Sequence, residues 1–245
     1  MRDEYAKRMP EENALKTRWI VYMDESYIHK NYCRHKDSLY DPSDEQDLTT
    51  ITTHKGQQYC FIAAIIDADH AISEELQSDE QKAGLLIDTL DIFEGGKKQT
   101  KDYHGMFDHA YFVGWMGRLL QALKDRNILN AIIVMDNAKY HKKLPEDVPK
   151  KQHKKAALQE ACRRYGIDFD IKKTKLMLWN KVHQFVQANI SPVVVKLAQD
   201  EGHKVLFSPP HYSDLQPIET VWAIVKGNVG RQYTTTITFK EVLQR

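Results

Sequence analysis

The chain has 245 residues, of which 42% are hydrophobic and 28% charged, proportions that fit an ordinary globular protein. Its net charge is only +1, which excludes a nucleic-acid-binding field spread over the whole molecule. A surface for an acidic partner must therefore come from local clustering of basic residues. No apolar run is long enough to span a membrane, and the charged N-terminal segment lacks the apolar centre of a secretion signal.

The cysteines indicate a reducing compartment. Cys33, Cys60 and Cys162 are odd in number, far apart and outside any CxxC pair, so they predict neither a disulfide framework nor a zinc ribbon. We expect a protein that is not secreted, nuclear in a eukaryote and otherwise cytoplasmic.

The first half of the chain predicts strands. A short polar helix is expected at 3–15, followed by an almost continuous apolar strand at 18–23. After a long turn-rich segment at 30–57, the pattern predicts strands at 58–66 and 84–93.

The second half alternates helices with short strands. Apolar residues at three- and four-residue steps predict a helix at 107–126, and a buried strand follows at 132–135. The remaining elements expected are helices at 153–165, 174–188 and 191–201, a strand at 205–207, a helix at 215–227 and a helical C-terminus from residue 239.

This order of elements predicts an α/β domain, with a mixed sheet flanked by helices. The segment from the third strand through helix 107–126 to the strand at 132–135 has the length of a crossover between parallel strands. We expect one domain over residues 1–245, with a lysine-rich helical insertion at about 140–200, before the last long helix.

Two aspartates follow buried strands. Asp24 comes directly after the strand at 18–23, and Asp136 comes directly after the strand at 132–135. A buried strand that ends in a carboxylate loses stability unless the charge is used, and ligands of α/β sheets bind at the carboxyl ends of the strands. One such aspartate is commonly a turn former or helix cap, whereas two on adjacent strands favour a shared site.

A third carboxylate lies at the start of a helix. Pro217 suits the first helical turn, and Ile218, Val221, Trp222 and Val225 form an apolar stripe. Glu219 lies beside this stripe, where the helix dipole favours a carboxylate. By itself, Glu219 is equally compatible with a solvated first-turn glutamate.

Together the three segments carry a family resemblance. The sequence reads MDES at 23–26, VMDNA at 134–138 with His141 after it, and PPHYSDLQPIE at 209–219. These segments resemble the three signature blocks of DDE-type transposases, the mariner-like and related bacterial insertion-sequence enzymes: DE(S/T), DNAxxH and PPYSPDLNPIE. The resemblance covers about residues 18–230 and implies a ribonuclease-H-like catalytic domain.

The resemblance implies that Asp24, Asp136 and Glu219 bind divalent metal, Mg²⁺ or Mn²⁺ and two ions in all, for DNA strand cleavage and strand transfer. The third block lacks the proline that usually follows Ser213. The separation of 83 positions between Asp136 and Glu219 exceeds that in the best-known mariner enzymes, which leaves Asp200 or Glu201 as alternative third ligands. Glu219 is preferred because its block is intact.

Neighbouring residues have less defined roles. If the strand continues past Asp24, Glu25 points to the opposite face and is expected to be structural. Asn137 orients Asp136, touches substrate or forms a turn. The Asp102–His104 segment is similar to a motif of longer relatives, and we assign it no role.

A basic stretch follows Asp136 closely. Residues 139–155 hold seven lysines against Glu146 and Asp147, a net charge of +5. We predict that this stretch binds DNA unless it is simply a solvated loop. The residues expected to contact DNA are Lys139, His141, Lys142, Lys143, Lys150 and Lys151.

Other readings remain open. The spacings of the eleven histidines, such as His104 and His109, do not fit a zinc site on one helix, and no Gly-rich loop predicts nucleotide or other small-molecule cofactor binding. The alternatives to a transposase are a ribonuclease-H-like nuclease that only hydrolyses and a host-recruited remnant that binds DNA without cutting.

The expected partners are transposon-end and target DNA, with a second subunit possible. Because the first catalytic strand begins near residue 18, we expect no helix-turn-helix module before it and little sequence specificity.

Overall fold

The computed structural model describes residues 19–30, 32, 57–67, 84–95, 107–209, 216–232, 236 and 238–244. The expected helix at 3–15, most of the turn-rich segment and the Asp102–His104 motif lie outside these residues.

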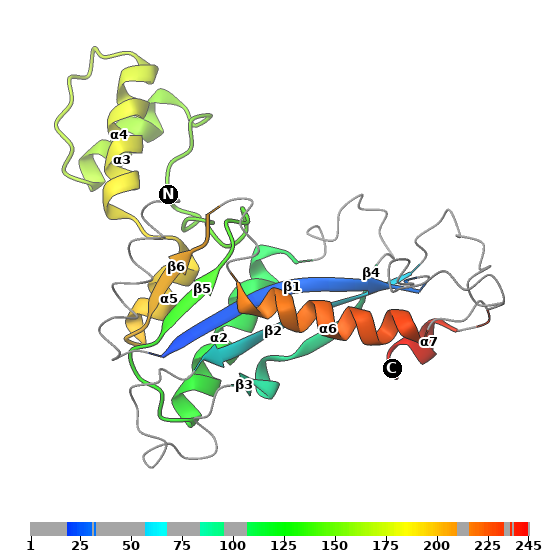
Figure 1. Cartoon of the computed structure of the whole chain (residues 1–245). Helices are drawn as coiled ribbons and strands as arrows, with labels where there is room; N and C mark the ends of the chain where they lie inside the picture. The colour runs from blue at the N-terminus through cyan, green and yellow to red at the C-terminus, as the bar shows by residue number, and fades with distance from the viewer. Residues whose placement is uncertain are drawn as a thin grey trace.

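The described strands form one mixed sheet (Figure 1). Its central strand β1 pairs antiparallel with β2 and parallel with β5, and β5 pairs parallel with β6. The order is β3-β2-β1-β5-β6, and β4 also pairs with β2. The bounds are β1 Ile20–His29, β2 Gln58–Asp67, β3 Gly84–Leu85, β4 Asp91–Gly95, β5 Ile132–Met135 and β6 Lys204–Phe207. The predicted class, a ribonuclease-H-like mixed sheet with flanking helices, is confirmed.

The first strand is longer than the sequence predicts. We expected it to end at Met23, but β1 continues to His29 because its antiparallel partner β2 accompanies it along its whole length. Its parallel pairing with β5 stops at Tyr22. Asp24 therefore lies inside a strand, just beyond the point where β5 leaves it, and the prediction that the strand ends at Asp24 is wrong.

The expected third strand is also corrected. A short 3-10 helix at Ile87–Thr89 divides it into β3 and β4. The Thr89 hydroxyl stabilises this turn, since it donates to the Leu86 carbonyl at 2.6 Å and accepts from the Ala64 backbone N–H at 2.9 Å. The crossover helix therefore leads from β4 to β5, whose parallel partner is β1 rather than the third strand.

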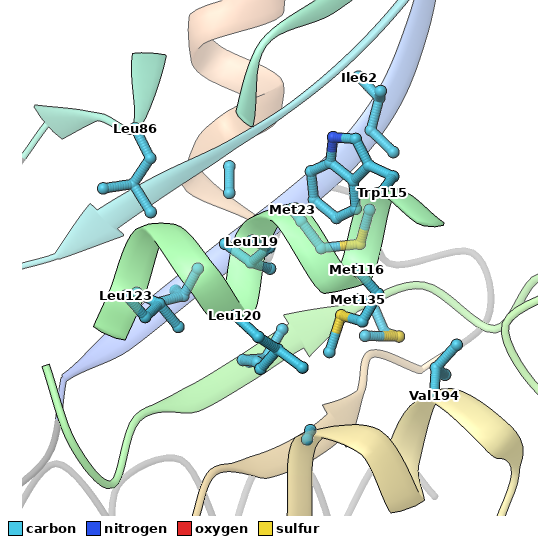
Figure 2. Close-up of a cluster of buried hydrophobic side chains, with 14 of the residues drawn as sticks. Met23, Ile62, Leu86, Trp115, Met116, Leu119, Leu120, Leu123, Met135 and Val194 are labelled. Atoms are coloured by element: carbon cyan, nitrogen blue, oxygen red, sulfur yellow. The ribbon is translucent and has the colours of Figure 1, made fainter. Parts of the chain in front are cut away.

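Two helices cover one face of the sheet. They are α2 (His109–Asp125) and α5 (Val193–Asp200). Trp115, Met116 and Leu119 of α2 pack on Met23 and Met135, and Val194 of α5 joins the same cluster (Figure 2). The first turn of α2 is capped by Asp108, which accepts from the Tyr111 backbone N–H at 2.8 Å.

The other face is covered by α6 (Pro217–Arg231) and α7 (Phe239–Val242). Ile218 and Trp222 are buried against even-numbered residues of β1 such as Tyr22. Pro217 occupies the first turn as predicted. The expected stripe is shorter than predicted, because Val225 is 39% exposed.

Two further helices form a separate cluster. They are α3 (Lys155–Arg164) and α4 (Lys175–Asn189), which share a small core of their own. Figure 1 shows them standing apart from the sheet. Cys60 and Cys162 are both buried free thiols. No helix in the described part of the chain is long and apolar enough to cross a membrane.

Candidate active site

Asp24 faces α6 from the middle of β1. Alternation along the strand directs odd residues such as Met23 towards α2 and even residues such as Tyr22 towards α6. The Trp222 indole N–H donates to Asp24 Oδ2 at 3.1 Å. A contact between β1 and α6 thus fixes the orientation of this carboxylate.

Asp136 follows the last residue of β5. Its Oδ1 accepts from the Ala138 backbone N–H at 2.8 Å and also lies 2.7 Å from His141 Nδ1. The Asp136 side chain is 37% exposed, so Oδ1 contacts the protein while the carboxylate still reaches solvent.

Glu219 lies in the first turn of α6, three residues before Trp222. Residues three apart share one face of a helix, so Glu219 is on the side of α6 that faces Asp24. The partial positive charge of the helix N-terminus favours its carboxylate there.

The three carboxylates interact electrostatically. The pKa of Asp24 is raised well above its ordinary 3.8, first by burial and then by the charges of Glu25, Glu219 and Asp136; the Trp222 hydrogen bond offsets only part of this. A buried carboxylate with like charges around it favours a bound cation. The structure therefore places Asp136 and Glu219 near enough to Asp24 for their charges to act on it.

The donor chemistry fits a hard divalent cation. Carboxylate oxygens are the ligands that Mg²⁺ prefers, and the half-buried Asp24 has one hydrogen bond that only partly offsets the burial and like charges that raise its pKa. Among the described residues, no three His, Cys, Asp or Glu side chains are placed to hold a metal ion as they stand.

The alternative third ligands lie elsewhere. Asp200 and Glu201 come before β6, whereas Asp136 follows β5. Because β5 and β6 are parallel and in register, with Met135 opposite Phe207, the start of β6 is at the far end of the sheet from Asp136. The geometry favours Glu219.

A buried histidine bridges two carboxylates. His141 is fully buried, with Nε2 3.0 Å from Glu25 Oε1 and Nδ1 2.7 Å from Asp136 Oδ1. Burial alone lowers the pKa of this imidazole, but Glu25 and Asp136 outweigh it and raise the pKa to about 9. His141 is therefore charged at neutral pH and donates to both carboxylates.

Glu25 points away from Asp24, as the sequence predicts. It is 5% exposed and holds His141 from the face of β1 opposite Asp24. His141 was expected to contact DNA, whereas its ring is enclosed by protein and contacts Asp136. Its geometry is that of a residue that positions a carboxylate.

Asn137 ties two strand ends together. Its amide donates to the Ser208 carbonyl just after β6, and its carbonyl oxygen accepts from the Lys142 ammonium. The Ser208 backbone N–H in turn donates to the Met135 carbonyl at 2.8 Å. Asn137 was predicted to orient Asp136, to touch substrate or to form a turn. Its described contacts correspond to the turn, which lies beside Asp136.

Two residues near the triad were not predicted from the sequence. Trp222 was interpreted only as a core anchor, and Lys226 was not singled out. The half-buried Lys226 has its pKa lowered by burial, although the charges of Glu219 and Asp24 oppose this. Trp222 and Lys226 lie three and seven residues after Glu219 on the same helix, so this spacing could have indicated that they share its face.

The basic residues expected to bind DNA divide into two groups. Lys139, Lys143, Lys150 and Lys151 are exposed. Lys142 is only partly exposed, because its ammonium contacts Asn137 and lies 5.0 Å from the centre of the Phe207 ring.

A family of known proteins matches part of the chain. Residues 90–240 match the family model described as DDE superfamily endonuclease. The match spans more than half of the 245 residues. The chain belongs to the DDE superfamily endonucleases. No curated protein matches it.

Solved structures of the Mos1 transposase are similar to the chain. A paired-end complex with the left transposon end aligns at 14% identity and a TM-score of 0.48, covering 98% of this chain and 50% of that chain. A Mos1 mariner paired-end complex with Mn aligns at 14% identity and a TM-score of 0.38, covering 82% of this chain and 61% of that chain. This chain thus spans about half the length of the first Mos1 chain.

Proposed function

We propose that the chain is the catalytic domain of a transposase, which cleaves DNA strands and joins them with divalent metal. The observation that carries the proposal is that Asp136, at the end of β5, and Glu219, in the first turn of α6, lie near enough to Asp24 of β1 for their charges to raise its pKa. Membership of the endonuclease family supports the cleavage half of the proposal.

In this proposal Asp24, Asp136 and Glu219 hold two Mg²⁺ or Mn²⁺ ions. When bound, such ions activate the attacking oxygen and stabilise the leaving oxygen of an in-line displacement at phosphorus. The carboxylates act as ligands, and none needs to form a covalent bond to DNA. Hydrolysis and strand transfer use the same three residues, since a DNA 3′-hydroxyl replaces water as the attacking group.

The surrounding residues position the ligands. The Trp222 N–H limits rotation of the Asp24 carboxylate, and His141 fixes one oxygen of Asp136. Glu25 keeps the His141 imidazole charged and oriented from behind. Positioning of this kind matters because groups around metal ligands tune both affinity and geometry.

DNA is the proposed partner. Lys139, Lys143, Lys150 and Lys151 present exposed ammonium groups in the segment that follows Asp136, and phosphate contacts by such groups dominate DNA affinity. Lys142 and His141 are proposed to act indirectly, through Asn137 and Asp136.

The test uses two substrates. Purified protein with Mg²⁺ or Mn²⁺ should nick a supercoiled plasmid, and it should join a pre-nicked duplex end with a free 3′-hydroxyl to a target strand. Glu219→Gln serves as the inactive control and Glu201→Gln as the active one. Nicking without joining supports a hydrolytic nuclease instead, and binding with neither reaction supports a non-cutting remnant.

A further inference from the structure

The segment between Lys143 and Val193 forms a closed module. The Val193 backbone N–H donates to the Lys143 carbonyl at 3.0 Å, so the chain leaves and re-enters the catalytic domain at one point. Within it, α3 and α4 pack around Leu158, Leu178 and Val182, which are fully buried. These side chains form a cluster distinct from the two that flank the sheet.

The two helices of the module run roughly parallel. Lys175 Nζ, at the start of α4, donates at 3.3 Å to the carbonyl of Gln152, which lies three residues before α3. The ring of Tyr165, directly after α3, stacks on that of Phe185 in the second half of α4, with centroids 4.9 Å apart. The connecting loop runs back along α3, where the Gln159 amide donates to the Ile171 carbonyl at 3.4 Å. Both helix N-termini therefore lie at the same end of the module.

That end carries most of the module's lysines. We name it the basic end, and it comprises Lys150, Lys151, Lys154, Lys155, Lys172, Lys173 and Lys175. Residues 139–192 hold thirteen Lys and Arg against five Asp and Glu, a net of +8, whereas the whole chain has +1. The near-neutral total thus conceals a strongly basic part and an acidic remainder.

Six of these seven lysines are exposed, and Lys155 is half-buried. Residues 170–177 are a continuous run of exposed residues. In the described part of the chain, the ion pairs of this module involve Lys143, Arg163 and Arg164 but no lysine of the basic end. The run also exposes apolar side chains, with Ile171 at 68% and Leu176 at 59%.

We propose that the basic end extends the DNA-binding surface beyond Lys150 and Lys151 and holds duplex DNA away from the cleaved phosphate. Its lysines and the positive ends of two parallel helices suit the closely spaced phosphates of a duplex. Ile171 and Leu176 suit contact with the deoxyribose sugars that line a minor groove, or insertion between its base steps. A second copy of this chain is disfavoured as the partner, because the seven lysines of one basic end would repel those of the other. This inference rests on the proposed function and identifies where the DNA is held.

The test is binding of a mixed-sequence duplex by the full chain in EDTA, measured against salt concentration. We expect the triple variant K172Q/K173Q/K175Q to bind more weakly and to flatten the slope of log K against log salt by about 2.7, at about 0.9 for each lost phosphate contact. The matched control is K124Q/K196Q/K240Q, which neutralises three exposed lysines of α2, α5 and α7 and should leave the slope unchanged.

A second variant isolates the apolar contact. Leu176→Gln should weaken binding several-fold without changing the salt slope, because it removes no charge. Equal salt slopes for the two triple variants would overturn the proposal. It would also be overturned if K172Q/K173Q/K175Q changed the sedimentation of the DNA-free protein, and so its self-association, but left DNA binding unchanged. Metal-dependent nicking by the unaltered chain is measured separately, so failure of the proposed function and failure of this surface give different results.

Discussion

The Glu25–His141 pair makes the stability of the metal-free protein depend on pH. Folding raises the pKa of His141 from 6.5 to about 9, despite a burial effect that acts in the opposite direction. A raised folded-state pKa contributes stability that is fully present below pH 6.5 and is lost as pH rises through about 9. The difference between these two pKa values corresponds to about 3 kcal/mol of unfolding free energy.

Glu25→Gln tests this reasoning. Glutamine keeps the shape and can still accept from His141 Nε2, but it removes the buried charge that raises the pKa most. Breaking a buried ion pair costs about 3–5 kcal/mol. Because Asp136 still contacts the imidazole, we expect a loss of about 2–3 kcal/mol at pH 6, shrinking towards zero by pH 10.

The measurement is urea unfolding in EDTA at several pH values between 6 and 10, followed by tryptophan fluorescence. Glu201→Gln is the matched control, since it removes an exposed glutamate from the C-terminus of α5. A cost of Glu25→Gln that is the same at pH 6 and pH 10 would refute the charged state assigned to His141.

Further predictions concern the triad and the module. Asp24→Asn, Asp136→Asn and Glu219→Gln should each abolish metal-dependent nicking of a plasmid, and circular dichroism should show an intact fold. Protonated Asp24 contributes stability that is fully present below pH 3.8 and is lost as pH rises through its raised folded-state pKa. Because Asn carries no charge to be buried beside Glu25, Glu219 and Asp136, Asp24→Asn should raise the metal-free melting temperature at pH 7. The same variant should reduce the thermal stabilisation given by Mg²⁺ in scanning calorimetry. Leu158→Ala should destabilise the module by about 2–5 kcal/mol, seen as faster amide exchange in α3 and α4 than in β1.

Local patterns in the sequence determined much of this protein. Alternation and helical periodicity placed β2, β5, α2 and α4 within two residues of their observed bounds. The three motif blocks identified Asp24, Asp136 and Glu219, because each block combines a buried strand or helix start with a carboxylate. Features of this kind depend on neighbours in the chain, so they are readable without a fold.

Tertiary structure decided what the local pattern does not contain. The length of β1 depends on its antiparallel partner β2, so the sequence around Asp24 could not show that the strand continues. The hydrogen bond of Trp222 to Asp24 joins residues 198 positions apart, and that of His141 to Glu25 joins residues 116 apart. Such contacts arise only when the sheet and its helices pack. For this reason the sequence indicated the metal-binding candidates but not the residues that hold them in place.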